Sequence, residues 1–161
     1  MFDDSKIDPK IIEAIDKYAS SHLISKRFIL ALILTESGFN PHAFRYEPVY
    51  IWVYSCKEVA TALHITKDSA TVMQKCSYGL CQIMGAVFHE YLGIIPQAQM
   101  YDIDTNIKCC CKYLEILANR KGIDCEKEPE KLYDIFNSGK IDDTDGNQKN
   151  VDRFMSNYLL F

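Results

Sequence analysis

The glutamate at position 36 stands at the end of the most apolar run of the sequence. The run from Phe28 to Leu34 reads Phe-Ile-Leu-Ala-Leu-Ile-Leu and predicts a buried helix, with Glu36 on its last turn. Desolvation and the negative end of the helix dipole both disfavour an ionised carboxyl group, so both raise its pKa. A carboxyl group that is still protonated near neutral pH can protonate a glycosidic oxygen and then act as a base. On position alone, a surface glutamate on a frayed last turn is the more ordinary interpretation.

Glu47 is a second candidate carboxylate, which would position a water molecule or stabilise an oxocarbenium ion. Arg45 lies two residues earlier, and a salt bridge between the two side chains is the simpler interpretation. Tyr50, Trp52 and Tyr54 alternate along the chain, so their rings could stack on sugars from one face. The same three rings fit an aromatic core at least as well.

The N-terminal segment carries the start and stop signals of two helices. Asp8 and Pro9 are a side-chain cap followed by a proline at the first helical position. Ser25 is suited to cap the next helix, which runs through residues 28–34 and stops near Gly38. This second helix is apolar on all sides, which is typical of a helix at the centre of a domain.

The middle of the chain gives mixed signals. Residues 50–54 fit a strand or an extended segment, whereas residues 55–63 and 66–73 have helical patterns. Residues 79–91 are expected to form a further helix that ends at Gly93.

The C-terminal part is expected to be helical throughout. Asp104 is a candidate cap for a long helix that Gly122 terminates. Pro129 begins a short helix, and apolar residues between 151 and 159 recur at helical spacing. The sequence therefore predicts a mainly α fold of seven or so helices, with at most a short β element.

Composition and charge narrow the class of protein. The 161 residues are 48% hydrophobic and 25% charged, which is ordinary for one soluble globular domain. The longest apolar stretch is too short to span a bilayer, so we expect no stable membrane association. A net charge of −4 leaves no basic excess for nucleic acid and no general attraction to a polyanionic cell wall. We expect a monomer that recognises its target in a cleft.

The cysteines and the N-terminus bear on cofactors and location. The seven cysteines cannot all pair within one chain, and they form neither a Cys-x-x-Cys pair nor a zinc-like spacing with histidine. We expect free, mostly buried thiols in a reducing compartment, with no metal and no cofactor. The start Met1-Phe2-Asp3-Asp4 lacks the basic and apolar parts of a secretory signal peptide. The sequence therefore predicts synthesis in a cytoplasm and release by another route.

Four segments resemble, in order, the motifs of lytic transglycosylases and goose-type lysozymes. Residues 36–43, Glu-Ser-Gly-Phe-Asn-Pro-His-Ala, resemble the glutamate motif of that family. Residues 77–84, Ser-Tyr-Gly-Leu-Cys-Gln-Ile-Met, resemble its Gly-Leu-Met-Gln motif. Residues 101–107 resemble the stretch that introduces the next helix, and residues 135–139, Ile-Phe-Asn-Ser-Gly, resemble the Ala-Tyr-Asn-Ala-Gly motif. Each segment alone is weak, but four in the family's order are hard to obtain by chance.

The resemblance implies a lysozyme-like helical fold, in a single domain over residues 1–161, with a cleft for a chain of N-acetylglucosamine and N-acetylmuramic acid. It makes Glu36 the catalytic acid/base. The residues that it places against the sugars are Ser77, Tyr78, Gly79, Gln82 and Asn137. For Gln82 and Asn137, bracing of the helix junctions is an equally good interpretation.

Two residues depart from the family's motifs. Phe136 replaces the usual tyrosine, so any hydroxyl contact that this residue makes is lost here, which bears on the orientation of the glutamate. Cys81 replaces a methionine, a small apolar change that should slightly widen the wall of the cleft.

The implied reaction is cleavage of the bond between N-acetylmuramic acid and N-acetylglucosamine in peptidoglycan. In a lytic transglycosylase, Glu36 would protonate this bond and then deprotonate the C6 hydroxyl, which closes a 1,6-anhydro ring. A muramidase that hydrolyses the same bond, with water in place of the C6 hydroxyl, is the nearest alternative. Ordinary glycosidases use two carboxylates for such a hydrolysis. A non-catalytic wall-binding or virion module is a second alternative, and a chitin-directed enzyme is a third.

The segment at 45–48 bears on the origin of the chain. Its sequence, Arg-Tyr-Glu-Pro, resembles a variant motif of phage-encoded cell-wall lysins. Together with the short length and the absence of a signal peptide, it suggests a phage endolysin or a virion-associated lysin.

Overall fold

The structure, a computed structural model, describes residues 6–139 and 147–161, which are mainly helical. The α-helices are α1 (Pro9–Ala19), α2 (Lys26–Glu36), α3 (Cys56–Leu63), α4 (Lys67–Gln74), α5 (Gly85–Leu92), α6 (Gln97–Met100), α7 (Ile103–Lys121), α8 (Pro129–Ser138) and α9 (Gln148–Tyr158). A 3-10 turn, η2 (Ser20–His22), follows α1, and β1 (Phe44–Tyr46), β2 (Cys76–Tyr78) and β3 (Ile83–Met84) form one small sheet. The predicted mainly α fold with a short β element is confirmed, while α6 was not predicted.

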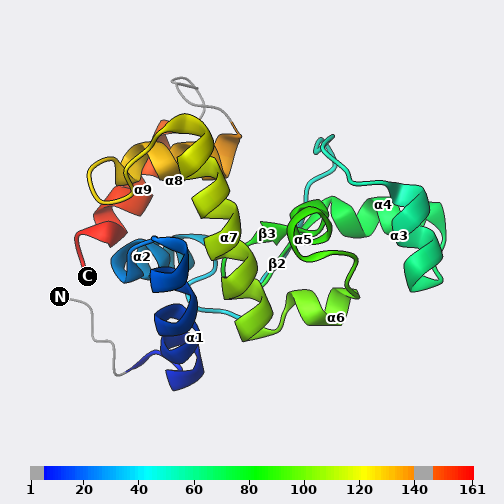
Figure 1. The fold of residues 1–161 in the computed structure, drawn as a ribbon, viewed down its shortest axis with the longest axis horizontal. Coiled ribbons are helices and arrows are strands. Elements are labelled where there is room, and N and C mark those ends of the chain that lie inside the picture. The colour runs from blue at the N-terminus through cyan, green and yellow to red at the C-terminus, as the bar shows by residue number, and fades with distance from the viewer. Residues whose placement is uncertain (1–5, 140–146) are drawn as a thin grey trace.

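Helix α2 lies at the centre of the helical half of the molecule, as its apolar sequence predicts. Its cap is Ser25, whose hydroxyl oxygen accepts a hydrogen bond of 3.1 Å from the backbone N–H of Phe28. The side chains from Phe28 to Ile33 are all buried. Helix α2 packs against α9 on one side and α1 on the other (Figure 1). Its last residue, Glu36, is thereby held in a rigid frame.

The N-cap of the long helix α7 lies two residues before the predicted cap at Asp104. Asp102 is the actual N-cap, and its carboxylate accepts a 2.9 Å hydrogen bond from the backbone N–H of Thr105. Asp104 lies within the first turn, where it accepts hydrogen bonds from Lys17 and Tyr18 of α1. The prediction was wrong because both aspartates are suitable caps, and the packing of α1 on α7 gives Asp104 other partners.

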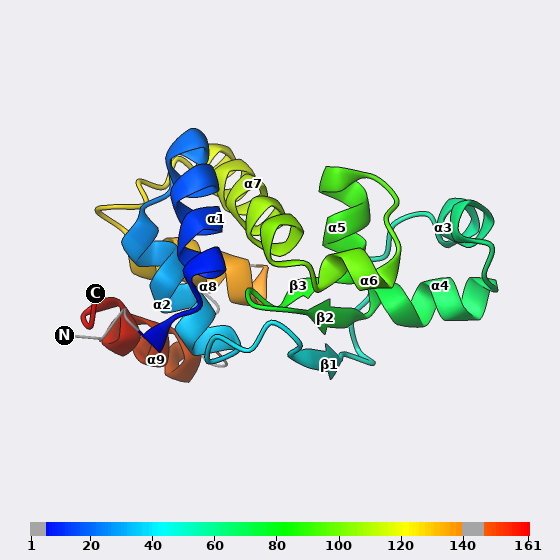
Figure 2. The same ribbon diagram turned by 90° about the horizontal axis from the view of Figure 1, so that it is seen from below.

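Residues 79–91 do not form the single helix that the sequence analysis expects. The chain turns sharply at 79–82 and returns as β3, so that the sheet has the antiparallel order β1-β2-β3 (Figure 2). Gly79 and Gln82 have positive φ angles of 70° and 49°, which a helix does not tolerate. Helix α5 begins only at Gly85. A short apolar run cannot distinguish strand from helix, and here tertiary pairing decides in favour of a strand.

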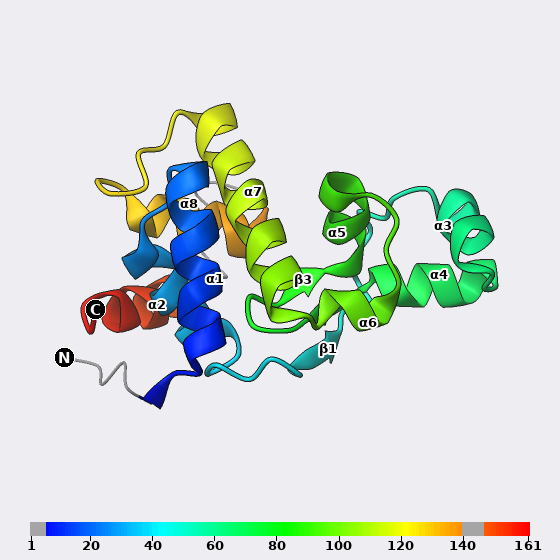
Figure 3. The ribbon, with the colours of Figure 1, turned by 60° about the horizontal axis from the view of Figure 1, so that its bottom comes forward.

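Residues 51–55 have no regular secondary structure, so of the two alternatives for residues 50–54, a strand or an extended segment, the strand is absent. They belong to a long connection between β1 and α3. Helices α3 and α4 then follow close to the predicted ranges. Figures 2 and 3 show this α3–α4 hairpin at the end of the molecule that lies farthest from α1 and α9.

The two halves of the molecule meet along α7, which contacts α1 and α8 on one side and α5 and β3 on the other (Figure 3). One hydrophobic cluster runs through both halves and contains Phe28, Tyr78, Phe88 and Leu114. The expectation of a single domain over the whole chain stays a prediction.

The cysteines are part of this core. Six of the seven are buried and all seven are free, and burial raises the pKa of the six buried thiols, most clearly at Cys110. Within the described ranges no helix has the length and apolar character needed to cross a membrane. The same part of the chain holds no group of His, Cys, Asp or Glu suited to bind a metal ion. The predicted absence of a signal peptide concerns residues 1–4, which lie outside the described residues.

Candidate active site

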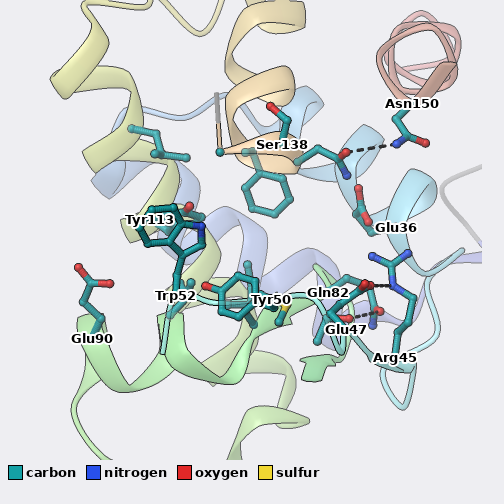
Figure 4. Close-up of a pocket in the computed structure, with 18 of the residues that line it drawn as sticks. Glu36, Arg45, Glu47, Tyr50, Trp52, Gln82, Glu90, Tyr113, Ser138 and Asn150 are labelled. Carbon is teal, nitrogen blue, oxygen red and sulfur yellow. Dashed lines mark hydrogen bonds and ion pairs between the residues drawn. The ribbon is translucent and has the colours of Figure 1, made fainter. Parts of the chain in front are cut away.

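A cleft of about 650 Å³ separates the helical half from the sheet and contains Glu36 in its wall. One wall is built from the ends of α2 and α8 together with α7 and α9, and the other from β1, the loop after it and α5. Figure 4 shows Glu36, Arg45 and Asn150 at one end of this cleft, with Trp52 and Tyr113 at the other. The cleft is long enough to hold several groups of one extended ligand.

Glu36 is the last residue of α2 and is held by a short hydrogen bond. The hydroxyl of Tyr133 donates to its Oε1 atom at 2.7 Å. Burial raises the pKa of the Glu36 carboxyl group above its usual value, although the Tyr133 hydroxyl and the charges of Arg153 and Arg45 partly oppose this rise. Glu36 is therefore a carboxylic acid that keeps its proton to a higher pH than an ordinary glutamate does.

Tyr133 is a site residue that the sequence analysis missed. It is fully buried in α8 and stacks on Phe154 of α9, with ring centroids 4.3 Å apart and ring planes 2° from parallel. Burial raises the pKa of its hydroxyl, which therefore stays protonated as a donor. Tyr133 lies three residues before Phe136, on the same face of α8. That spacing is the signal in the sequence that could have found it.

Phe136 has no hydroxyl group, as expected from the sequence, but Glu36 still has a partner that orients it. The Phe136 ring packs between Tyr113 and Tyr133, at centroid distances of 5.9 and 6.4 Å. The hydroxyl that orients Glu36 belongs to Tyr133, on the preceding turn of the same helix.

The charged residues around Glu36 include one ion pair. Arg45 of β1 pairs with Glu47, and both residues line the cleft (Figure 4). The contact of Glu47 is therefore the salt bridge with Arg45, the simpler of its two interpretations. Arg153 of α9 lines the same end, so that the carboxyl group of Glu36 faces two positive charges.

Two of the predicted substrate-binding residues, Ser77 and Gln82, line the cleft next to each other. The Ser77 hydroxyl donates to Oε1 of Gln82 at 2.8 Å, and Nε2 of Gln82 donates to the carbonyl of Gly79 at 3.0 Å. Gln82 thus braces the turn between β2 and β3 while it faces the cleft.

Tyr78 and Gly79 are in packing positions and are not among the described residues that line the cleft. The Tyr78 side chain is fully buried, and its hydroxyl donates to the carbonyl of Met73 at 2.8 Å. A Cβ atom at Gly79 would lie 2.5 Å from the side-chain nitrogen of Asn106, so the turn requires glycine there. Sugar contact by these two residues stays a prediction.

Asn106 at the start of α7 holds this turn in place. Its Nδ2 donates to the carbonyls of Tyr78 and Met100 at 2.8 and 2.9 Å, and its Oδ1 accepts from the N–H of Cys81 at 2.9 Å. The amide is completely buried. A polar residue among the apolar positions of α7 was a signal for such a role.

Asn137 lies near the end of α8, where it lines the cleft. Its Oδ1 accepts a 3.2 Å hydrogen bond from Asn150 of α9, and its side chain is near enough to Glu36 to contribute to lowering the pKa of that carboxyl group. It therefore combines the bracing role with a position next to the candidate acid. The site as a whole offers a carboxyl group with a raised pKa, that of Glu36, in a groove with amide and hydroxyl groups around it.

The fold is mainly helical, and its cleft holds the half-buried carboxyl group of Glu36. The sequence matches the family model described as Transglycosylase SLT domain over residues 13–140, and the chain belongs to this family. The family has a lysozyme-like fold, and its members are lytic transglycosylases that cleave glycosidic bonds of peptidoglycan. The family resemblance seen in the sequence is thereby confirmed. Neither the curated proteins nor the solved structures include a match for this chain.

Proposed function

We propose that this protein is a lytic transglycosylase that cleaves the β-1,4 bond between N-acetylmuramic acid and N-acetylglucosamine, with Glu36 as its only acid/base. The observation that carries the proposal is the half-buried carboxyl group of Glu36 in the cleft, with a raised pKa and the Tyr133 hydroxyl on one of its oxygens. A carboxyl group that keeps its proton to a higher pH than an ordinary glutamate is suited to protonate the bridging oxygen of a glycan held beside it.

The reaction uses Glu36 twice. The carboxyl group first donates its proton to the bridging oxygen, so that the C1–O bond breaks and N-acetylglucosamine leaves with a new hydroxyl group. The intermediate at C1 is oxocarbenium-like or assisted by the acetamido group. The Glu36 carboxylate then takes the proton of the C6 hydroxyl while that oxygen bonds to C1. The product is a 1,6-anhydro ring, the acid is restored, and no water is consumed.

The neighbouring residues have supporting roles in this proposal. Tyr133 orients the carboxyl group, and Asn137 contacts the reacting sugar from the same wall. Ser77 and Gln82 contact the glycan from the opposite wall.

Hydrolysis of the same bond by a muramidase is the alternative. A water-using glycosidase needs a second carboxylate that holds the water or stabilises the sugar cation. Glu47 is the candidate for that role, but its carboxylate is paired with Arg45. This ion pair favours the transglycosylase reaction.

The experiment is mass spectrometry of the soluble fragments released from purified peptidoglycan by the wild type and by Glu36→Gln. We expect muropeptides lighter by one water, with 1,6-anhydro-muramic acid ends, and none from the variant. Reducing muramic acid ends would instead establish a muramidase. If no fragment depends on Glu36 while the protein still binds the wall, the protein is a wall-binding module.

We infer in addition that the enzyme acts on the cell wall as a phage lysin. The support is the segment 45–48, which resembles phage lysin motifs and whose Arg45 and Glu47 line the cleft. Expression inside a bacterium together with a membrane-permeabilising protein should lyse the culture for the wild type and not for Glu36→Gln. Equal survival of both cultures would contradict a role in lysis.

A further inference from the structure

The loop at residues 49–54 exposes several apolar side chains that the proposed reaction does not use. Val49 is 84% exposed, Ile51 71% and Trp52 74%. Single exposed apolar residues are common on protein surfaces, but a group of them often marks a binding surface. The aromatic-core interpretation of Trp52 is therefore excluded by its exposure.

This loop forms the rim of the cleft. Residues 49–52 all line it, whereas Tyr54 is not among the described lining residues. Figure 4 shows the Trp52 indole at the end of the cleft opposite Glu36, and Tyr113 of α7 lines the same cleft. A ligand that reaches Trp52 and Glu36 together must therefore extend along the length of the cleft.

The wall that faces Trp52 is a row of aromatic rings. Tyr113 stacks on Tyr91 of α5 at a centroid distance of 5.4 Å and lies 5.9 Å from Phe136. Phe136 adjoins Tyr133, which holds Glu36. The rings of this row that line the cleft are Phe136, Tyr113 and Tyr91, and they lead from the part of the wall next to Tyr133 toward the end that holds Trp52.

Polar groups accompany these rings. Glu90 and Arg120 line the same part of the cleft, and Tyr50 lies beside them with a pKa raised to about 12, mainly by burial. Hexose rings have apolar C–H faces and a circumference of hydroxyl and amide groups. A flat indole with charged and hydroxyl groups around it matches that chemistry.

We propose that Trp52, together with the Tyr113–Tyr91 wall, forms a sugar-binding subsite that stacks on an N-acetylhexosamine ring at the end of the cleft opposite Glu36. The proposal rests on the proposed function, because the same glycan strand would occupy both ends of the cleft. The subsite makes the enzyme prefer long strands over short ones.

The sequence supplies a direct reporter for this test, since Trp52 is its only tryptophan. The Glu36→Gln protein, which retains Trp52, is titrated with peptide-free glycan strands prepared from peptidoglycan with an amidase. We expect a saturable change in tryptophan emission. Vesicles of zwitterionic and anionic lipid are the second probe, and they should leave the emission unchanged. A response to vesicles alone would show that the loop binds membranes and would overturn the proposal.

The kinetic test compares two aromatic residues of the same loop. Trp52→Ala should raise KM for long glycan strands about tenfold while kcat stays within about twofold, and Trp52→Phe should recover most of the loss. Tyr54→Ala is the matched control and should leave both constants unchanged. A Trp52→Ala enzyme with the wild-type KM would overturn the subsite.

The two proposals can fail separately. If the wild type releases no fragments but glycan strands still alter the Trp52 emission, the subsite stands and the reaction is wrong. If Glu36-dependent fragments appear but the strands leave the emission unchanged, the reaction stands and the subsite is wrong.

Discussion

Opposing influences act on the carboxyl group of Glu36. Burial favours its neutral form, whereas the Tyr133 hydroxyl and the charges of Arg153 and Arg45 favour the carboxylate. The balance leaves the pKa raised, which suits a group that must first donate a proton and then accept one. The hydrogen bond from Tyr133 also fixes the direction of the carboxyl oxygens.

Replacement of Tyr133 by phenylalanine should test its positioning role. Tyr133→Phe removes a donor to the carboxylate, so the pKa of Glu36 should rise further. We expect kcat to fall about tenfold and the limb of the pH profile that reports Glu36 to move to higher pH. Tyr158→Phe, which alters another tyrosine packed on Phe154, is the control and should leave the pH profile unmoved.

The raised pKa of Glu36 also predicts how stability depends on pH. A carboxyl group with a higher pKa in the folded state stabilises the fold below its unfolded pKa, and this contribution is lost as pH rises through the folded pKa. Glutamine does not titrate. The free energy of unfolding of Glu36→Gln, relative to wild type, should therefore increase between about pH 4 and pH 8. Denaturant titrations at both pH values measure it, and a decrease would mean that the pKa is lowered.

Glu47 separates the two candidate reactions. Because its carboxylate is already paired with Arg45, Glu47→Gln should keep turnover within about twofold of wild type. Fragment release from purified peptidoglycan gives the rate. A loss of about a hundredfold or more would instead assign Glu47 the role of a second catalytic carboxylate.

At the scale of elements, the turn between β2 and β3 depends on a residue of α7. Asn106 satisfies three backbone groups of the turn and of the end of α6, and Gly79 leaves room for its side chain. This turn places Gln82 in the wall of the cleft. Packing of α7 on the sheet is thus what shapes this wall.

Removal of the Asn106 amide should therefore destabilise the fold. Asn106→Ala leaves buried donors and acceptors without partners, so we expect a loss of about 3 kcal/mol in the free energy of unfolding. Urea denaturation measures the loss, and Lys108→Ala, an exposed change on the same helix, is the control. A variant as stable as this control would show that water replaces the amide.

At the scale of the whole molecule, the cleft lies between the helical half and the sheet, and we expect recognition to take place inside it. The net charge of −4 offers no general attraction to an anionic wall. Binding should therefore depend on the stacked rings and on amide and hydroxyl groups of the cleft.

The rate of peptidoglycan cleavage should then vary little with salt. Between about 50 and about 200 mM sodium chloride, we expect a change within about twofold, because no counterion-releasing contact dominates. Turbidity loss of purified cell walls at fixed pH provides the rate. A steep fall with rising salt would point to binding through surface cations.

The sequence by itself determined the features that depend on neighbouring residues. Ser25 and Gly122 mark helix ends through local hydrogen bonds and a positive φ angle, and the apolar run before Glu36 predicts a buried helix with an acid at its end. The ordered motifs predicted the family and with it the fold. These inferences hold because caps, periodicity and motifs act over a few residues.

Only the tertiary structure decided which distant residues meet. Tyr133 reaches Glu36 across 97 positions of the sequence, and Asn106 meets Tyr78 across 28. The same packing converts the start of the predicted helix at 79–91 into a turn and a strand, and it leaves Trp52 exposed on the rim of the cleft. No local pattern encodes such contacts, because they depend on the way in which whole helices and strands pack against one another.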